Sequence, residues 1–437
     1  MAEPGTIQEH YDAIIVGGRV AGASLATHIV QQGYSALVVE RAAFPRDTLS
    51  THIFQNLDTL ERLGVLDRLL ATGAPLLTEF RLRMDGLDLS QDHDDLPMLA
   101  VRRRVLDPIL LDRAARAGAD VLSPARVTGL LSNGARVTGV RLRDPGRRER
   151  EIHARVVVGA DGRTSTVARL VGARRYNVTR SERSGGFAYF EGVEPGPVFH
   201  FYVEGTDYFL GYSTDSGLFL ASMMWGSPDF RRYHDADGTA FDAALATCRP
   251  LAKALAGGRR IRPPVFIGGW EGYFREAAGP GWVLVGDAGH FKDPAPGQGI
   301  SDALRQAEGL AAAICRGIET HTLPAQLKAW WRWRDWDAAE MYWWAREFGR
   351  GGRQSPVIAE MLRAMAGSPR ALRATHEIVF HRRRPFRVFT PPRVAAAATR
   401  LLVAGSLPRG QVLAETRTLV RRDLERRYRT RRPKYEE

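Results

Sequence analysis

The thirty residues from Tyr11 to Glu40 constrain the fold of this chain more than any other stretch. A short apolar run rich in β-branched residues is interrupted by Gly17 and Gly18. A helical pattern follows and ends at Gly33, and a second apolar run then leads to Glu40. Apolar runs of this length are typical of strands buried on both faces of a parallel sheet. The order predicts a βαβ unit of the kind that binds a dinucleotide.

The glycine turn matches the dinucleotide fingerprint G-x-G-x-x-G at two of its three glycines. Gly17 and Gly22 are the first and third, whereas Arg19 replaces the middle one. The start of the following helix would offer free N–H groups to a pyrophosphate, and Glu40 could accept hydrogen bonds from a ribose diol. Arg19 would have to point away from the pyrophosphate or clasp it. The alternative is a glycine-rich crossover that binds no nucleotide.

The composition predicts an ordinary globular protein and argues against membrane-spanning, disulfide-rich and zinc-binding classes. The chain has 437 residues, 44% hydrophobic and 25% charged, which predicts two or three ordinary globular domains. We find no apolar run long enough to span a membrane and no secretory signal. Cys248 and Cys315 are too few for a disulfide framework and have no zinc-type spacing, so we expect no metal site and a cytoplasmic location.

The net charge of +13 does not indicate a nucleic-acid-binding protein. Of the 62 basic residues only four are lysine, and the excess does not form one stripe interleaved with aromatics. Much of the charge lies in residues 417–434, where we expect a solvated helix and a frayed end.

Hydrophobic periodicity predicts alternating helices and strands in the first two thirds of the chain and helices in the rest. Strands are expected over residues 78–89 with a turn at Asp85-Gly86, 121–142 with a turn at Asn133-Gly134, 152–158, 185–225 and 282–285, and helices over 54–70, 102–118, 241–255, 299–316 and most of the chain after 323.

Two further buried strands end in Gly and Asp. One runs into Asp161-Gly162 and the other into Gly286-Asp287. Ligands of open α/β sheets lie at the carboxyl ends of the strands, so these ends and the first glycine turn could meet one extended cofactor. The small residues from Pro294 to Gly299 would let a helix amino terminus approach a ring closely and favour negative charge on it.

Together these motifs resemble the flavin monooxygenases of the para-hydroxybenzoate hydroxylase fold, a superfamily that also includes geranylgeranyl reductases and flavin-dependent halogenases. The resemblance covers residues 11–316. It implies an α/β fold with a discontinuous Rossmann-like FAD-binding domain, an inserted antiparallel β-sheet substrate domain and a helical C-terminal region. The expected parts are 1–75, 99–180 and 271–325 for FAD, 76–98 and 181–270 for the substrate, and 326–437 for the helices.

The resemblance also assigns FAD contacts to individual positions. Arg103 matches the family's arginine before the second helix, and the loop from Ala42 to His52 resembles one that lies along the flavin in an actinobacterial-type branch that also tolerates Arg at position 19. The residues expected to bind FAD are Gly17, Gly18, Arg19, Ala21, Gly22, Glu40, Arg41, Arg46, Thr48, Arg103, Asp161, Gly162, Gly286, Asp287, Pro294, Gly297, Gln298, Gly299 and Ile300.

The activity implied by the resemblance is that of an FAD-dependent monooxygenase. One oxygen atom of O₂ would pass through a flavin C4a-hydroperoxide to a hydrophobic, aromatic or polycyclic small molecule. NAD(P)H would supply electrons, directly or through a partner flavin reductase. The first alternative is a reductase of the geranylgeranyl type and the second a halogenase. The halogenase is disfavoured because residues 73–98 hold no lysine to relay hypohalous acid and Trp225–Pro228 does not match the W-x-W-x-I-P stretch. A flavoprotein that only binds a ligand or partner is a further alternative.

The sequence offers fewer candidate residues for catalysis and substrate binding than for FAD binding. His52, His290 and Lys292 lie in loops expected near the flavin, as proton carriers or as structural hydrogen-bonding groups. Strand alternation predicts that Phe187 and Tyr189 share a face and that His200 and Tyr202 share one. With Trp225 they could line an aromatic substrate pocket or simply pack a core.

The segment after residue 326 contains an unusual density of tryptophans, namely Trp330, Trp331, Trp333, Trp336, Trp343 and Trp344. They indicate a lid or dimer face, or a helix buried against the substrate domain, which we favour. The chain is expected to act as a monomer or homodimer.

Overall fold

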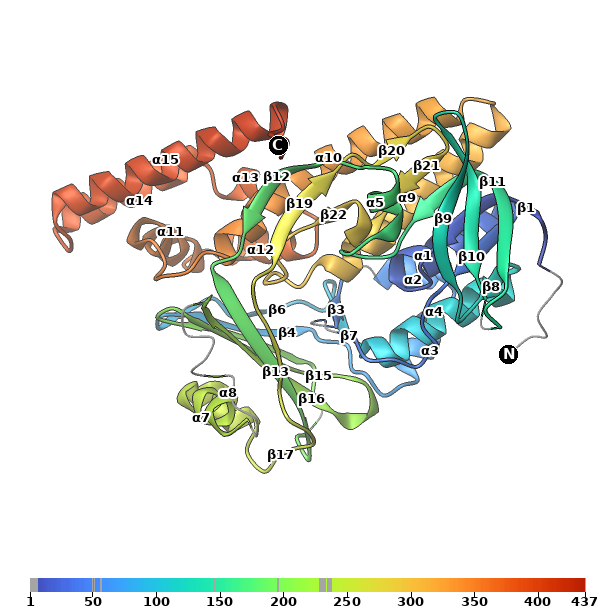
Figure 1. Cartoon of the computed structure of the whole chain (residues 1–437). Helices are drawn as coiled ribbons and strands as arrows, with labels where there is room; N and C mark the ends of the chain where they lie inside the picture. Colours follow the sequence, from blue (N-terminus) through green and yellow to red (C-terminus); the bar gives the residue numbers. More distant parts are fainter. Residues whose placement is uncertain are drawn as a thin grey trace.

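The computed structural model describes residues 7–48, 50, 52–55, 57–144, 146–194, 196–227, 233 and 238–436. A mostly parallel sheet with helices against it occupies one end of the molecule, and an antiparallel sheet with a layer of C-terminal helices occupies the other (Figure 1). One long helix, α10 (Leu323–Phe348), runs along both. The predicted fold class is confirmed, whereas the exact domain boundaries stay a prediction.

The parallel sheet is built around the βαβ unit at the amino terminus. Its strand order is β20-β21-β11-β1-β2-β8, and β10 and β9 extend β11 as an antiparallel pair. Ile14 and Ile15 of β1 face Val157 and Val158 of β11 and Leu37 and Val38 of β2, and all six are fully buried. The strands are β1 (His10–Val16), β2 (Ala36–Val39), β8 (Asp120–Leu122), β9 (Arg126–Asn133), β10 (Arg136–Arg143), β11 (Glu149–Gly159), β20 (Ala278–Gly279) and β21 (Trp282–Leu284).

Helices cover this sheet and bring distant parts of the chain together. α1 packs against both α4 and α9, and α10 packs against α9. Gly118 adopts a left-handed conformation and ends α4 where the sequence predicts an end. The helices of this part are α1 (Val20–Gln31), α2 (Leu57–Leu63), α3 (Leu66–Leu70), α4 (Arg103–Ala117), α5 (Thr166–Leu170) and α9 (Gly299–Glu319).

The antiparallel sheet has an apolar layer on each face. One face packs with Phe80, Tyr189 and Phe380 in one cluster, and the other lies under α7 (Thr239–Thr247) and α8 (Arg249–Ala254). β14 pairs in parallel with β4, so residues 79–92 join a sheet otherwise formed after residue 183. The strands are β4 (Glu79–Met84), β5 (Leu87–Asp88), β6 (Gln91–Asp92), β13 (Arg183–Glu191), β14 (Val198–Glu204), β15 (Asp207–Ser213), β16 (Phe219–Gly226), β17 (Arg259–Arg260) and β18 (Val265–Ile267).

Two small sheets join these parts. β3 (Ile53–Phe54) pairs with β7 (Leu99–Ala100), while β19 (Glu271–Arg275) lies between β12 (Arg175–Arg180) and β22 (His290–Phe291). They hold the loops that follow β2 and β21 close to the antiparallel sheet.

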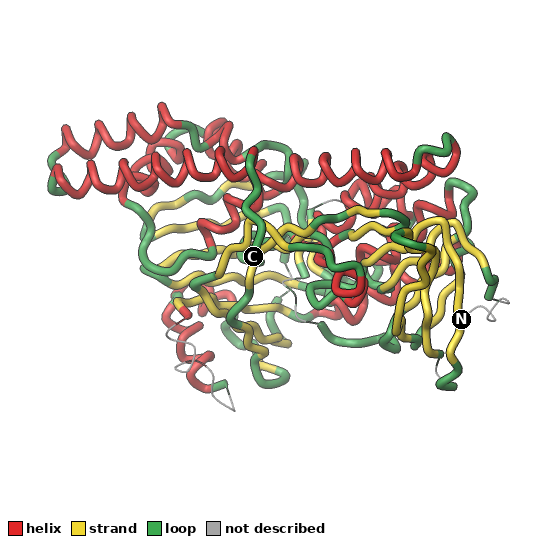
Figure 2. Tube along the Cα trace, turned by 45° about the horizontal axis from the view of Figure 1, so that its top comes forward, coloured by secondary structure: helices red, strands yellow, loops and turns green. Residues whose placement is uncertain are grey.

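The C-terminal helices form a layer beside the antiparallel sheet (Figure 2). They are α11 (Pro356–Ala366), α12 (Pro369–Val379), α13 (Pro385–Val388), α14 (Pro391–Ala404) and α15 (Arg409–Arg431). The tryptophans of α10 do not all face one surface: Trp330 belongs to the core of the parallel sheet, Trp344 packs among the C-terminal helices, and Trp336 is 60% exposed. Burial against the antiparallel sheet, which the sequence analysis expected to bind substrate, is therefore not the position of all of them.

The end of the chain is docked rather than frayed, which corrects the prediction. Asn177 N donates to the Lys434 carbonyl (2.7 Å), and Asn177 Oδ1 accepts from Lys434 N (3.0 Å). The Tyr435 ring lies 5.1 Å from that of Tyr176, and Arg175 pairs with Glu436. The tail thus pairs with β12, far away in the sequence.

The element predictions hold over most of the chain. The turns at Asp85-Gly86 and Asn133-Gly134 join β4 to β5 and β9 to β10.

Within the described ranges, no helix is long and apolar enough to cross a bilayer, and no three His, Cys, Asp or Glu side chains form a group that could hold a metal ion.

Candidate active site

The turn between β1 and α1 can be built only from glycine at two positions. Gly17 has a φ of +107°, and a Cβ there would lie 2.5 Å from the carbonyl oxygen of Ala160. A Cβ on Gly22 would lie 1.8 Å from the carbonyl oxygen of Gly17. Helix α1 begins after Arg19 without a side-chain cap and without an acidic residue in its first turn. Its free N–H groups therefore fit a pyrophosphate.

Glu40 organises the other side of this turn. Its Oε2 accepts from Gly18 N and its Oε1 from Ala42 N, both at 2.8 Å, and the residue is 4% exposed. Each carboxylate oxygen keeps a second lone pair, which fits an adenosine ribose. The N–H of Gly18 is already used by Glu40, so phosphate binding would rely on the N–H groups of the helix itself.

The two predicted arginines meet at a buried carboxylate that the sequence analysis missed. Arg103 donates to Asp107 through Nε (2.7 Å) and Nη2 (3.0 Å), and Arg19 Nη1 lies 3.8 Å from the same carboxylate. Asp107 is fully buried, and burial raises its pKa against the opposing effect of the arginines. The spacing of four residues between Arg103 and Asp107 on one helix was the available signal.

The predicted flavin loop after β2 is tied to the antiparallel sheet side. Arg41 and Arg46 are exposed and Thr48 is half-buried. Asp47 lies 3.1 Å from Arg262 and 3.8 Å from Arg104. Leu49 and Thr51, which belong to the same predicted loop, lie outside the described residues.

Asp161 and Gly162 follow β11, next to the glycine turn. Asp161 accepts from the Ser165 hydroxyl and from Thr166 N (2.6 Å), so its carboxylate caps the short helix α5. Burial raises its pKa. Gly162 has open space where a Cβ would stand. The structure places this motif beside Ala160, whose carbonyl abuts Gly17, and gives its side chain a structural task.

Gly286 and Asp287 follow β21 and face the start of α1. A Cβ on Gly286 would lie 3.0 Å from the Cβ of Ala21. The Asp287 carboxylate accepts no hydrogen bond from any described residue, whereas its main-chain carbonyl accepts from Tyr273 (2.7 Å). Burial raises the pKa of Asp287 to about 6, opposed by Arg103 and Arg163. A half-buried carboxylate without a partner among the described residues fits a ribityl hydroxyl.

The turn from Pro294 to Gly299 leads into α9. Gly297 N donates to the Pro294 carbonyl (2.9 Å), and α9 has no side-chain cap. The amide of Gln298 accepts from Lys292 Nζ (2.8 Å) and donates to the carbonyl of Val379 (3.0 Å), so it faces the C-terminal helices rather than the helix start. Ile300 is buried in the main core and Gly299 is exposed.

Of the three catalytic candidates, His52 is the one that contacts the antiparallel sheet, through side chains of β13. Its Nε2 is hydrogen-bonded to the Tyr189 hydroxyl, and its ring also contacts Phe187. Burial, with Arg103 and Arg102 nearby, lowers the pKa of His52 to about 3. His52 is therefore neutral and positions Tyr189 rather than carrying charge.

Lys292 and His290 are enclosed. Lys292 Nζ lies 2.8 Å from Asp302, whose other oxygen lies 3.3 Å from His381. Burial lowers the pKa of Lys292 and holds that of His290 well below its usual range. The His290 ring packs against Phe274 and Tyr342. Both side chains are thus placed as structural links between the flavin-side turn and the helices.

A cavity of about 1020 Å³ lies between the antiparallel sheet, the Pro294 to Gly299 turn and the C-terminal helices. Its apolar wall comes from β4, β14 and β15, and its outer wall from α11, α12, α14 and α15. Lining residues include Ile53, Gln55, Phe80, Leu82, Met98, Phe199, Phe201, Leu210, Ala295, Pro296, Gly297, Trp344, Ile358, His376, Phe380, Val394 and Leu419. Gln55 is hydrogen-bonded to Ser301 of α9, a contact that no sequence pattern indicated.

The five predicted substrate residues lie on two different faces of the sheet. Phe187 and Tyr189 pack in the cluster beside the large cavity without lining it. Trp225 and Tyr202 belong to the opposite cluster, under α7 and α8, and His200 is bonded to Tyr202 (2.8 Å). The structure therefore does not bring His200, Tyr202 and Trp225 to the large cavity.

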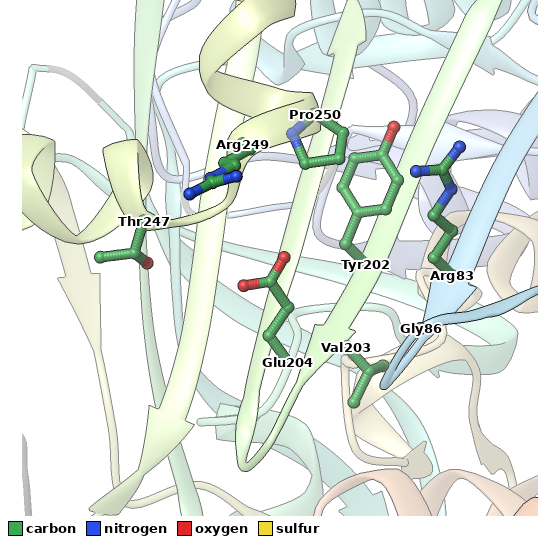
Figure 3. A pocket seen from close by; sticks show the side chains of 8 residues that line it. All are labelled: Arg83, Gly86, Tyr202, Val203, Glu204, Thr247, Arg249 and Pro250. Carbon is green, nitrogen blue, oxygen red and sulfur yellow. The ribbon is translucent and has the colours of Figure 1, made fainter.

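A second cavity, of about 360 Å³, opens on that opposite face. Figure 3 shows Arg83, Tyr202 and Glu204 around it, with Arg249 and Pro250 at the start of α8. It is small, polar at its rim and separated by the sheet from the Pro294 to Gly299 turn, so we do not assign the chemistry to it.

Comparisons with known proteins agree with this geometry. Residues 10–221 match the family model described as an FAD binding domain. A 1H-pyrrole-2-carbonyl-[peptidyl-carrier protein] chlorinase of Pseudomonas fluorescens is 24% identical over 364 residues, which cover 71% of this chain and 77% of that protein.

Two solved structures show the same fold. The flavin-dependent brominase Bmp2 superposes with a TM-score of 0.75 at 18% identity, over 91% of this chain and 99% of the other. PqsL, a probable FAD-dependent monooxygenase from Pseudomonas aeruginosa, superposes with a TM-score of 0.62 at 20% identity, over 89% and 99%.

Proposed function

Since the chain belongs to the superfamily of FAD-dependent oxidoreductases that includes para-hydroxybenzoate hydroxylase and the geranylgeranyl reductases, we propose that it is a monooxygenase of a hydrophobic small molecule. NAD(P)H, used directly or through a flavin reductase, would supply the electrons. Bound FAD would supply the redox chemistry with O₂. The chain itself would bind and orient both molecules and exclude water.

The large cavity is the observation that carries this proposal. It reaches from the turn at Ala295 and Gly297 along the apolar face of the sheet, and its volume suits an aromatic or polycyclic molecule. Phe80, Phe199 and Phe201 offer ring faces and edges to such a substrate. The apolar wall that the sheet contributes would also keep water from the reacting oxygen.

The polar side chains near the turn from Pro294 to Gly299 are better suited to position the flavin and substrate than to transfer protons. His52 is neutral, and Lys292 is held by Asp302 and Gln298. Oxygen transfer from FAD to a substrate asks the protein mainly for position and shielding. The half-buried Asp287 would hold the ribityl chain, and the uncapped start of α9 would favour negative charge on the flavin ring.

A halogenase is the second candidate, favoured by the similarity to a chlorinase and a brominase. The lysines argue against it. Three of the four, Lys253, Lys328 and Lys434, lie on α8, on α10 and in the tail, away from the cavity lining. The fourth, Lys292, is buried in an ion pair with Asp302. A reductase of the geranylgeranyl type is the third candidate.

The test begins with anaerobic mixing of the FAD-loaded protein with NADH or NADPH, with and without candidate aromatic substrates. Oxygen is then admitted as ¹⁸O₂. We expect substrate to accelerate flavin reduction or reoxidation and the product to carry one ¹⁸O atom. A product that gains halogen only when chloride or bromide is present would establish the halogenase instead, and a saturated product formed without O₂ would establish the reductase.

A further inference from the structure

Helix α15 carries an exposed apolar stripe along its outward face. Leu413, Val420, Leu424 and Tyr428 are 58%, 48%, 62% and 53% exposed. They follow one another at spacings of seven and four residues, so they lie on one side of the helix. Isolated exposed apolar residues are ordinary, but an aligned stripe marks an interaction surface.

Arginines flank this stripe on both sides. Arg409, Arg417, Arg421, Arg427 and Arg431 fall on the same outward face and are all exposed. Only Arg427 is paired, with Asp423, among the ion pairs of the described residues. The acidic residues of the helix, Glu415, Asp423 and Glu425, project from its other sides. The outward face thus carries apolar residues along its middle, with arginines on both edges and two of them, Arg417 and Arg431, among the apolar residues.

The stripe is continuous with the large cavity. Val420 and Leu424 line the cavity and are also about half exposed. In Figure 1, α15 is the outermost helix of the C-terminal layer. A surface that covered its outward face would therefore lie at the mouth of the cavity.

We propose that the outward face of α15 binds an anionic phospholipid surface and thereby sets the mouth of the cavity against the bilayer. An amphipathic helix with apolar residues between arginines lies in the plane of a membrane interface, held by apolar burial and by attraction to anionic headgroups. The role of this contact in delivering substrate rests on the proposed function, whereas the contact itself does not.

A second copy of the chain is a poorer occupant. In a symmetric dimer the same face meets itself, which would set the arginines of two helices against one another without acidic partners. An acidic protein would satisfy the arginines, and the experiment below separates it from a lipid surface.

The test is flotation of the full-length, FAD-loaded protein with vesicles of phosphatidylcholine alone or mixed with phosphatidylglycerol. We expect binding to the mixed vesicles only, weakened by salt. The pair Arg417→Gln and Arg421→Gln should lower the partition coefficient about 30-fold, as expected for two charges at an anionic surface. Leu413→Gln with Leu424→Gln should lower it about tenfold.

The matched control is Arg147→Gln with Arg148→Gln, which removes two exposed arginines from the β10–β11 loop. It should bind vesicles as the unaltered protein does. If the control and test variants lost vesicle binding equally, the binding would depend only on the protein's net charge, and the proposal would be overturned. So would equal binding to both vesicle types, or no binding to either.

Two further results would also overturn it. A dimer in light scattering that becomes a monomer in the Leu413→Gln, Leu424→Gln variant would assign the face to a second copy. Salt-sensitive binding to an acidic protein, with no vesicle binding, would assign it to a protein partner. Because flotation needs no turnover, failure of the monooxygenase proposal would leave its outcome intact, and the reverse also holds.

Discussion

The pyrophosphate end and the cavity end of this molecule are assembled differently. Around the glycine turn, Gly22 touches Gly17 and Gly18 is bound by Glu40 within one βαβ unit, and Gly17 also abuts the carbonyl of Ala160 at the end of the neighbouring strand β11. The wall of the large cavity is shared by β4, by β14 and β15, by the turn before α9 and by helices near the end of the chain. The first region has almost no tolerance for a change in side-chain size, and the second tolerates changes that alter its shape.

This difference indicates which region of the molecule would determine substrate specificity. The glycine turn recognises a group common to all dinucleotides through main-chain N–H groups. In our proposal, the cavity recognises a substrate through side chains contributed by separate segments, each of which can vary by itself. Proteins that share the first region can therefore differ in the second.

The largest effect is expected at the glycine turn. Gly22→Ala would place a methyl group 1.8 Å from the carbonyl oxygen of Gly17, which forces α1 away from β1. We expect FAD affinity to fall about 100-fold or more. The control is Gly410→Ala on α15, where a Cβ would meet nothing within 4 Å. Retention of FAD by the Gly22→Ala protein through gel filtration would contradict this account of the turn.

A change of the cavity wall should separate the two regions. Leu82→Trp would fill part of the cavity, so we expect kcat/KM for a large substrate to fall about 100-fold while FAD remains bound. Arg83→Trp, at the next position of β4, faces the small cavity on the other side of the sheet and should leave kcat/KM nearly unchanged. Equal effects of the two changes would mean that the large cavity does not hold the substrate.

The same contrast explains which features could be predicted from the sequence. The βαβ unit, the hairpin turns and the end of α4 at Gly118 depend on neighbouring residues, and the structure has all of them. Strand alternation correctly paired His200 with Tyr202 and Phe187 with Tyr189. It could not tell which pair lies on the cavity side of the sheet, because that depends on whether α7 or the C-terminal helices cover each face.

Long-range contacts account for the other misses. Asp107 looks like a solvated charge on an amphipathic helix, yet it is buried between Arg19 and Arg103. The basic tail resembles a frayed end, yet it docks on β12 through main-chain hydrogen bonds. The tail pairs with another element, and Asp107 is held by Arg19 of another element as well as by Arg103 of its own helix. Hydrophobic periodicity carries no information about either contact.

The third prediction concerns Asp287, the half-buried acid between the two regions. Its pKa is raised to about 6, so the folded protein binds the proton more tightly than the unfolded chain. Asp287 therefore disfavours folding above pH 6, and this penalty disappears as the pH falls toward 4. Without FAD, Asp287→Asn should be about 2 kcal/mol more stable at pH 7.5, a figure reduced for partial exposure, and no more stable near pH 4.

In the presence of FAD the sign should reverse, because a carboxylate accepts hydrogen bonds from ribityl hydroxyls better than an amide does. Denaturant unfolding of both proteins, with and without FAD, across this pH range measures both effects. If the stability difference between the unaltered protein and Asp287→Asn did not change with pH, the pKa of Asp287 would not be raised in the folded protein, and this account of the residue would be wrong.

The smallest effect is expected at the tail. Glu436 forms a half-exposed pair with Arg175, so Glu436→Gln should lower the free energy of unfolding by about 0.5 kcal/mol. Glu425→Gln, an exposed glutamate of α15 without an ion pair among the described residues, is the control and should change it less. The change at Glu436 should also speed hydrogen exchange at the amides of Asn177 and Lys434, since both bond across the junction of tail and β12. Unchanged exchange at these amides would show that the main-chain contacts and the Tyr435 ring hold the tail without help from the ion pair.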